Sequence, residues 1–263
     1  MINSTMIDIQ HLSVIFDQEG PTEHIALDNI NLTVQEGEFL VVLGCNGAGK
    51  TTLMKALAGE TPIARGSIIV DNKDITHLPK YARTNKISRI CQDPLRGTFA
   101  HLTIEENLTL AYKRGQKRRL TPAINKSRRN HFKSLLNLLG LELENKLALK
   151  MGLLSGGQRQ AVCLIMAFLQ DAKVLLLDEH TAALDPIMSE RIMQLTSQLV
   201  KEHGLTTVMI THDHAQAIKY GSRTIVMQQG KIIEDKKAKT STERTGNVND
   251  SLFSMDILPN FIR

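Results

Sequence analysis

The sequence predicts an α/β fold built around a mainly parallel β-sheet. Three short runs, at 39–43, 174–177 and 206–210, are dominated by apolar and β-branched residues. Runs of this length without polar alternation are typical of strands buried on both faces of a parallel sheet. Helical patterns at 50–58 and 186–203 lie between such runs. Alternation of strands and helices indicates crossover connections and therefore parallel pairing.

The first part of the chain differs from this pattern. Residues 6–35 predict short strands around a polar loop at 17–23, and 65–74 predict a hairpin. Hairpins and short loops join antiparallel strands. We therefore expect an N-terminal antiparallel β region, followed by a further strand at 87–92.

The composition changes at about Pro94. Residues 104–112 and 127–139 predict two helices, the second with an apolar stripe that ends before Gly140. We interpret 94–153 as a helical subdomain inserted into the α/β core. The core would then comprise 1–93 and 154–236, and 237–263 would form a C-terminal tail.

Composition limits the class of protein. The 263 residues carry a net charge of +5, with 42% hydrophobic residues. This mild charge gives no reason to expect a nucleic acid partner. The longest apolar run, 161–169, is much shorter than the roughly 20 residues that cross a bilayer. Three scattered cysteines give no disulfide framework.

A glycine-rich segment directly follows the apolar run at 39–43. It has the pattern Gly-x4-Gly-Lys-Thr, and its residues are Gly44, Cys45, Asn46, Gly47, Ala48, Gly49, Lys50 and Thr51, with Thr52 next. Such a loop presents backbone N–H groups to phosphate, and the following helix directs its positive end at the same anion. The lysine adds a positive charge, and the threonine hydroxyl is a ligand for Mg²⁺. The segment predicts a P-loop NTPase core that binds ATP and Mg²⁺.

The run at 174–177 ends in Asp178 and Glu179. In open α/β sheets, ligands bind at the carboxyl ends of the strands. Asp178 is therefore a candidate Mg²⁺ ligand, and Glu179 is a candidate general base for an attacking water.

The segment at 154–158 reads Leu-Ser-Gly-Gly-Gln. Ser155 can cap a helix beginning at Gly156, and Gln158 can complete a capping box. A helix N-terminus containing Gly156 and Gly157 can also bind an anion.

Together these motifs resemble the ATP-binding-cassette (ABC) ATPases, specifically the nucleotide-binding subunit of a transporter, over about residues 6–236. The resemblance implies that Ser155 to Gln158 of one copy close over the ATP held by Lys50 of a second copy. It also assigns Gln92 to Mg²⁺ contact and Asp185 to the contact between copies. His212 would contact the γ-phosphate and act in catalysis with Glu179 and Lys50.

Alternative interpretations apply to several of these residues. Phe16 would pack against adenine in the family, or it is an ordinary core residue. Asp185 can also cap the helix at 186–203. His212 and His214 could be metal ligands, which is a weaker prediction without a third ligand.

Two features concern this branch of the family. His180 stands where many members have proline, and with the segment at 92–98 it resembles a bacterial importer branch labelled as tryptophan/tyrosine-type uptake. The resemblance implies separate transmembrane permease subunits, an extracytoplasmic solute-binding protein and a peripheral position on the cytoplasmic face of the inner membrane. The alternatives are an exporter, a lipid-extraction ATPase, or a soluble member such as an iron–sulfur assembly factor.

The cysteines suggest one further hypothesis. Cys45 lies in the phosphate loop and Cys91 precedes Gln92. A positive field beside nucleotide would lower the pKa of such thiols and make them reactive. The alternative is that both are buried and inert.

Overall fold

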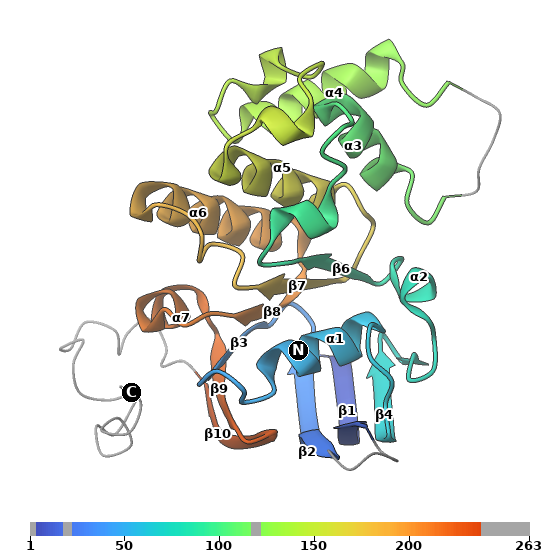
Figure 1. Ribbon diagram of the computed structural model, residues 1–263, viewed down its shortest axis with the longest axis vertical. Helices are drawn as coiled ribbons and strands as arrows, with labels where there is room; N and C mark the ends of the chain where they lie inside the picture. The colour runs from blue at the N-terminus through green and yellow to red at the C-terminus, as the bar shows by residue number, and fades with distance from the viewer. Residues whose placement is uncertain (1–3, 18–22, 117–121, 238–263) are drawn as a thin grey trace.

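The computed structural model describes residues 4–17, 23–116 and 122–237. Two sheets lie on either side of the first helix (Figure 1). The six-stranded sheet has the order β10 (Lys231–Lys237), β9 (Arg223–Gln228), β3 (Phe39–Gly44), β8 (Thr206–Ile210), β7 (Val174–Asp178) and β6 (Ile87–Ile90). The four-stranded sheet has the order β2 (His24–Gln35), β1 (Thr5–Phe16), β4 (Arg65–Val70) and β5 (Lys73–Asp74).

The pairing agrees with the predicted fold class. In the larger sheet β3 pairs in parallel with both β8 and β9, and β7 pairs in parallel with β6 and β8. The hairpin of β9 and β10 adds one antiparallel edge. The smaller sheet is antiparallel throughout. Its strands β1 and β2 are 12 residues each, and so are longer than the short strands expected at 6–35.

Ten helical segments connect these strands in the described part of the chain. The α-helices are α1 (Lys50–Ala58), α2 (Lys80–Arg83), α3 (Ile104–Tyr112), α4 (Lys126–Asn137), α5 (Gly156–Phe168), α6 (Pro186–His203) and α7 (His214–Tyr220). The 3-10 turns are η1 (Pro94–Gly97), η2 (Leu143–Asn145) and η3 (Met151–Leu153). None of these described helices is both long and apolar enough to span a bilayer.

The alternation of β3 explains why its sequence is uniformly apolar. Phe39, Val41 and Leu43 pack into one core cluster together with α3 to α6. Leu40 and Val42 point to the other face, into a second cluster that contains α1 and the antiparallel sheet. Each side chain of β3 therefore has apolar neighbours, which is what a strand between two packed layers requires.

The segment 94–153 is helical, and it packs closely on the core. Its buried residues Ile104, Phe132 and Leu136 belong to the same cluster as α5 and β7. Figure 1 shows α3 and α4 above α5, on the side of the larger sheet that faces away from α1. The subdomain boundary at 153/154 stays a prediction, because one continuous cluster crosses it. The expected tail at 237–263 lies outside the described residues, apart from Lys237 at the end of β10.

Parallel pairing brings the ends of several strands to one edge of the sheet. The strands β3, β7 and β8 end at Gly44, Asp178 and Ile210. The phosphate loop, Glu179 and His212 follow these three ends. The strand β6 ends at Ile90 instead of continuing to Gln92 as expected, so Gln92 lies in the loop at the same edge.

Candidate nucleotide site

The phosphate loop needs glycine where its backbone passes close to other backbone. Gly44 has φ +146°, and a Cβ there would lie 2.3 Å from the carbonyl oxygen of Met227. Gly49 has φ +98°, and its Cβ would lie 2.6 Å from the carbonyl oxygen of Ala26. Both conformations belong to the region that favours glycine. The loop then enters α1 at Lys50, so the N-terminus of α1 faces the loop.

Lys50 is buried within this loop. Its Nζ donates hydrogen bonds to the carbonyl oxygens of Gly44, at 2.7 Å, and Cys45, at 2.9 Å. Burial lowers the pKa of Lys50, while the nearby carboxylates of Glu179 and Asp178 act in the opposite direction. A cation in such a cradle is suited to bind phosphate oxygens.

Glu179 lies at the centre of the residues predicted for catalysis. Its Oε1 is 2.6 Å from His212 Nε2, and its Oε2 accepts a hydrogen bond from Gln92 Nε2 at 3.2 Å. Its backbone has φ +46°, which is uncommon for a residue other than glycine. The structure therefore brings together three predicted residues from three separate loops.

Asp178 is the last residue of β7, and its side chain is only 8% exposed. Its Oδ2 accepts a hydrogen bond from Arg89 Nη2 at 2.7 Å. Thr51 is exposed in the first turn of α1. Carboxylate, hydroxyl and amide oxygens are ligands that suit Mg²⁺, so Asp178, Thr51 and Gln92 fit the ion chemically. The three were predicted as its ligands.

The alternative metal site at His212 and His214 finds no support. No group of three or more His, Cys, Asp or Glu side chains suitable for a metal occurs among the described residues. Asp213 instead caps α7, because its carboxylate accepts hydrogen bonds from the backbone of Ala215 and Gln216.

The segment at 154–158 forms the predicted capping box. Ser155 Oγ accepts from the backbone N–H of Gln158 at 3.3 Å, and Gln158 Oε1 accepts from the backbone N–H of Ser155 at 3.2 Å. Ser155 and Gly156 are exposed at the tip of α5, and Gly157 is half-buried. This tip is therefore accessible to a second molecule.

No sequence motif singled out Arg159, which holds the turn before this tip. The Arg159 guanidinium donates to the carbonyl oxygens of Met151, Gly152 and Leu154, each at 3.2 Å. These carbonyls belong to the turn that precedes Ser155. The position of Arg159 in the first turn of α5 was a weak sequence signal for this contact, because an arginine there can reach back to the preceding loop. Many helices carry such an arginine without making that contact.

Asp185 caps α6, with its carboxylate accepting from the backbone N–H of Met188 at 3.0 Å. The capping interpretation is therefore confirmed, and because Asp185 is exposed it also remains available to a second copy.

Phe16 is not a core residue. It is 40% exposed at the end of β1, opposite His24 on β2. The same end of this hairpin contacts the phosphate loop, where Ala26 approaches Gly49. This position leaves the aromatic ring free to pack on a ligand.

Burial shifts the pKa of two further titratable side chains, His180 and Cys91. His180 is 2% exposed, and burial lowers its pKa to about 4, so the imidazole is neutral near pH 7. The lowered thiol pKa expected for Cys91 is wrong, because burial raises it. The desolvation of a thiolate there outweighs the attraction of Arg89.

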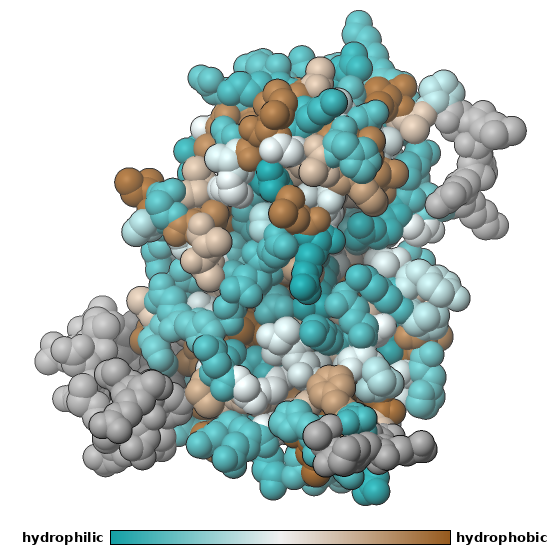
Figure 2. All heavy atoms as spheres, in the orientation of Figure 1, coloured by the Kyte–Doolittle hydropathy of each residue, from teal (hydrophilic) through white to brown (hydrophobic). Residues whose placement is uncertain are grey.

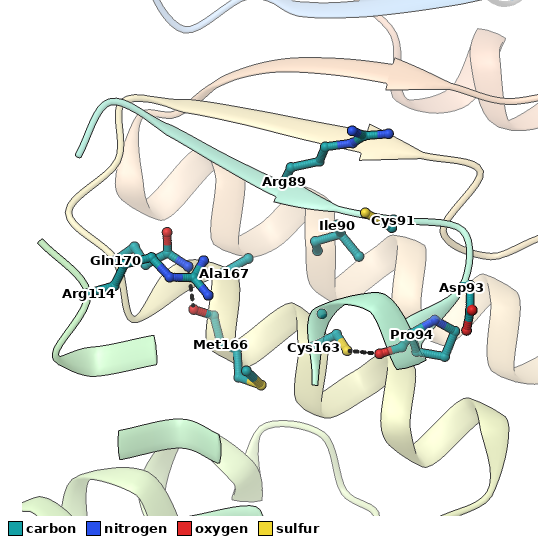
Figure 3. Close-up of a pocket in the computed structure, with 11 residues that line it drawn as sticks. Arg89, Ile90, Cys91, Asp93, Pro94, Arg114, Cys163, Met166, Ala167 and Gln170 are labelled. Carbon is teal, nitrogen blue, oxygen red and sulfur yellow. Dashed lines mark hydrogen bonds between the residues drawn. The ribbon is translucent and has the colours of Figure 1, made fainter. Parts of the chain in front are cut away.

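A cavity of about 50 Å³ lies beside this site, between β6, η1 and α5 (Figure 3). Cys91 and Cys163 are among its lining residues, and the Cys163 thiol donates to the carbonyl oxygen of Pro94 at 3.7 Å. Cys163 is buried in the core, and this burial raises the pKa of its thiol to about 12.

Known proteins are similar to this chain in sequence. The sequence profile of the family described as "ABC transporter" matches residues 27–182. The chain is 39% identical to a tyrosine transport ATP-binding protein of Clostridioides difficile, over 91% of this chain and 95% of that protein. It is 33% identical to the spermidine/putrescine import ATP-binding protein PotA of Pasteurella multocida, over 84% of this chain but only 57% of PotA.

Solved structures resemble the fold as well. The ATP-binding cassette MJ0796, in a dimeric post-hydrolysis state bound to ADP and Pi, superposes with a TM-score of 0.77 at 29% identity. The match covers 89% of this chain and 99% of that one. The structure of cbiO1 from Clostridium perfringens, part of the cbiONQ transporter complex, matches with a TM-score of 0.74 at 28% identity.

Proposed function

The chain belongs to the ABC transporter family of ATP-binding subunits, and from this premise we propose that it powers a bacterial importer of small solutes, in particular amino acids. The family assignment makes it an ATPase. The observation that carries the proposed mechanism is Glu179, held between His212 and Gln92 at the edge of the sheet that carries the phosphate loop. A carboxylate fixed in this way can orient and deprotonate a water that attacks the γ-phosphate.

The proposed roles follow from the contacts. Backbone N–H groups of 44–49 and the Lys50 ammonium bind the phosphates. Thr51, Asp178 and Gln92 would hold Mg²⁺, which neutralises phosphate charge when bound. Glu179 accepts a proton from the attacking water, and His212 stabilises the charge that develops on the γ-phosphate. Phe16 packs on the adenine ring.

We further propose that each ATP lies between two copies of the chain. Ser155, Gly156 and Gly157 form an exposed helix tip that can bind the γ-phosphate through backbone N–H groups. Asp185, which is exposed next to α6, would contact the second copy. Closure of the pair would depend on ATP, since both copies bind the same phosphate.

The membrane partners are proposed from the relatives. The similarity to the tyrosine transport protein favours uptake of an aromatic amino acid through separate permease chains, with a solute-binding protein outside the membrane. The chain would then sit on the cytoplasmic face of the inner membrane.

Replacement of Glu179 by glutamine tests the catalytic assignment. The amide cannot accept the proton, so we expect ATP hydrolysis to fall by about 100-fold or more while ATP still binds. Light scattering should then detect an ATP-dependent dimer that persists. Undiminished turnover of this variant would refute the role of Glu179.

Purification of the chain from its native membrane tests the transport assignment. We expect a multi-span permease to co-purify, and radiolabelled tyrosine uptake to depend on this subunit. Recovery with soluble proteins alone would contradict the transporter and favour a soluble ABC ATPase. If the co-purified permease drives efflux, the proposed import is wrong and the transporter is an exporter.

A further inference from the structure

Four side chains of alternating charge connect the surface to the nucleotide site. Lys80 Nζ lies 2.8 Å from Glu60 Oε1, and Glu60 Oε2 accepts a hydrogen bond from Arg89 Nη1 at 2.6 Å. The other terminal nitrogen of Arg89 donates to Asp178 Oδ2 at 2.7 Å. The same guanidinium therefore contacts a carboxylate at the end of α1 and the carboxylate assigned to Mg²⁺.

The inner part of this chain is shielded from water. The side chains of Arg89 and Asp178 are 10% and 8% exposed, whereas Lys80 is 66% exposed. Solvent screens a buried pair far less than an exposed one. Arg89 therefore acts on Asp178 as a close cation whose field is weakly screened.

The strand β6 fixes the direction of this contact. Figure 3 shows the Arg89 side chain leaving β6 on the side opposite Ile90. Arg89 pairs with Leu176 of the neighbouring strand β7, and Asp178 lies two residues further along β7. The guanidinium thus reaches Asp178 along the strand direction, and its second contact with Glu60 holds it in that orientation.

We propose that Arg89 is a positioning residue that holds the Asp178 carboxylate and sets the Mg²⁺ requirement of nucleotide binding. The inference rests on the proposed function, in which Asp178 binds Mg²⁺. A cation at Asp178 opposes the approach of a second cation, because Mg²⁺ must share a carboxylate that is already paired. The negative charge of Glu60 partly offsets the positive charge of Arg89, and so reduces the repulsion between Arg89 and Mg²⁺.

The charges predict opposite effects for two substitutions. Arg89→Gln removes the competing cation. The Mg²⁺ concentration that gives half of the maximal effect of Mg²⁺ on nucleotide binding should therefore fall by about fivefold. Glu60→Gln leaves Arg89 paired with Asp178 alone, and this concentration should rise. Arg89→Lys keeps the charge but not the planar fork, and it should stay within about twofold of the unmodified protein.

The measurement is a binding titration that involves no turnover. A fluorescent ADP analogue is titrated into each variant at fixed Mg²⁺ concentrations from none to saturating, at pH 8. The Mg²⁺ concentration that produces half of the total change in the nucleotide dissociation constant gives the Mg²⁺ requirement. This concentration distinguishes the proposed role from a loss of folded protein, which would reduce the amount of bound nucleotide equally at every Mg²⁺ concentration.

Arg223→Gln is the matched control. The Arg223 side chain is 12% exposed, and it pairs with Glu38 and Asp235 away from the nucleotide loops. Its loss should lower the thermal unfolding temperature without changing the Mg²⁺ dependence. A similar change in Mg²⁺ dependence for Arg223→Gln and Arg89→Gln would overturn the proposal.

The outcomes separate the inference from the proposed function. If the unmodified protein binds nucleotide with no Mg²⁺ dependence, the assignment of the metal site itself fails. If it shows that dependence and Arg89→Gln leaves it unchanged or raises the Mg²⁺ requirement, only the role of Arg89 fails. Should Arg89→Gln not fold, Glu60→Gln decides, and an unchanged or lowered Mg²⁺ requirement there contradicts the proposal.

Discussion

At the scale of single residues, the phosphate loop is fixed by backbone space as much as by charge. Gly44 and Gly49 each have a positive φ, and at both positions a methyl group would overlap a carbonyl oxygen of another segment. The neighbouring segments are β2 and the end of β9, so the loop is held by both sheets. Any side chain at these positions would displace the loop from its partners.

Gly44→Ala provides the test of this constraint. The added Cβ would lie 2.3 Å from the Met227 carbonyl oxygen, and we expect a cost of about 1–3 kcal/mol in the free energy of unfolding, with weakened nucleotide binding. Gly37→Ala is the control, since Gly37 also has a positive φ, +73°, but no atom lies within 4 Å of its Cβ position. Chemical denaturation that ranks the two variants equally would contradict the steric explanation.

The site residues differ in how far the sequence predicted them. Lys50, Asp178 and Glu179 stand in motifs whose spacing already indicates phosphate chemistry. Arg89 and Arg159 do not, because their roles depend on contacts with Asp178 and with the turn at 151–154 that arise only when the strands and helices pack. Burial likewise raises the pKa of the Cys91 thiol, whereas its position in the sequence suggested a lowered pKa.

At the scale of elements, one carboxylate joins the antiparallel sheet to the edge of the parallel one. Asp71 lies in the turn between β4 and β5, with its Oδ2 2.6 Å from Lys86 Nζ and its Oδ1 2.8 Å from Lys173 Nζ. Lys86 and Lys173 immediately precede β6 and β7. These contacts therefore connect the β4–β5 hairpin to the starts of two parallel strands.

Asp71→Asn should lower stability at pH 7, by about 1 kcal/mol because the pairs are partly exposed. The two lysines hold the pKa of Asp71 down from 3.8 to about 2. A depressed carboxyl pKa contributes stability above the unfolded value, and this contribution is lost as the pH falls through the folded value. The difference between unmodified and variant protein should therefore shrink between pH 3.8 and about 2. Denaturation curves measured across this range check the prediction, and a constant difference would contradict it.

Local pattern predicted most elements closely, and tertiary contact explains the deviations. The bounds of α1, α3 and α6 match the expected 50–58, 104–112 and 186–203, because capping residues mark their ends. The strands β1 and β2 extend further than expected, since their long pairing with one another continues through several register shifts. His11 and Asn29 lie beside these shifts and have positive φ values of 50° and 53°, which the apolar pattern used to predict the strands does not reveal.

At the scale of the whole molecule, the surface agrees with a protein that works in contact with others. Figure 2 shows apolar side chains at several places over the helical region. Leu153, next to the helix tip at Ser155, is 71% exposed, and Ile187, next to Asp185, is 84% exposed. Each of these apolar residues lies next to a position that we propose to contact the second copy of the chain. Burial of such side chains in an interface is favourable, which supports the proposed pair.

The central claim is that ATP is bound between two copies of the chain, and its most direct test is turnover per subunit as a function of protein concentration. We predict that turnover rises with concentration and then saturates. Ser155→Arg, which places a bulky side chain at the exposed helix tip, should abolish turnover while ATP still binds at Lys50. Turnover per subunit that is independent of dilution, and unaffected by Ser155→Arg, would contradict the account.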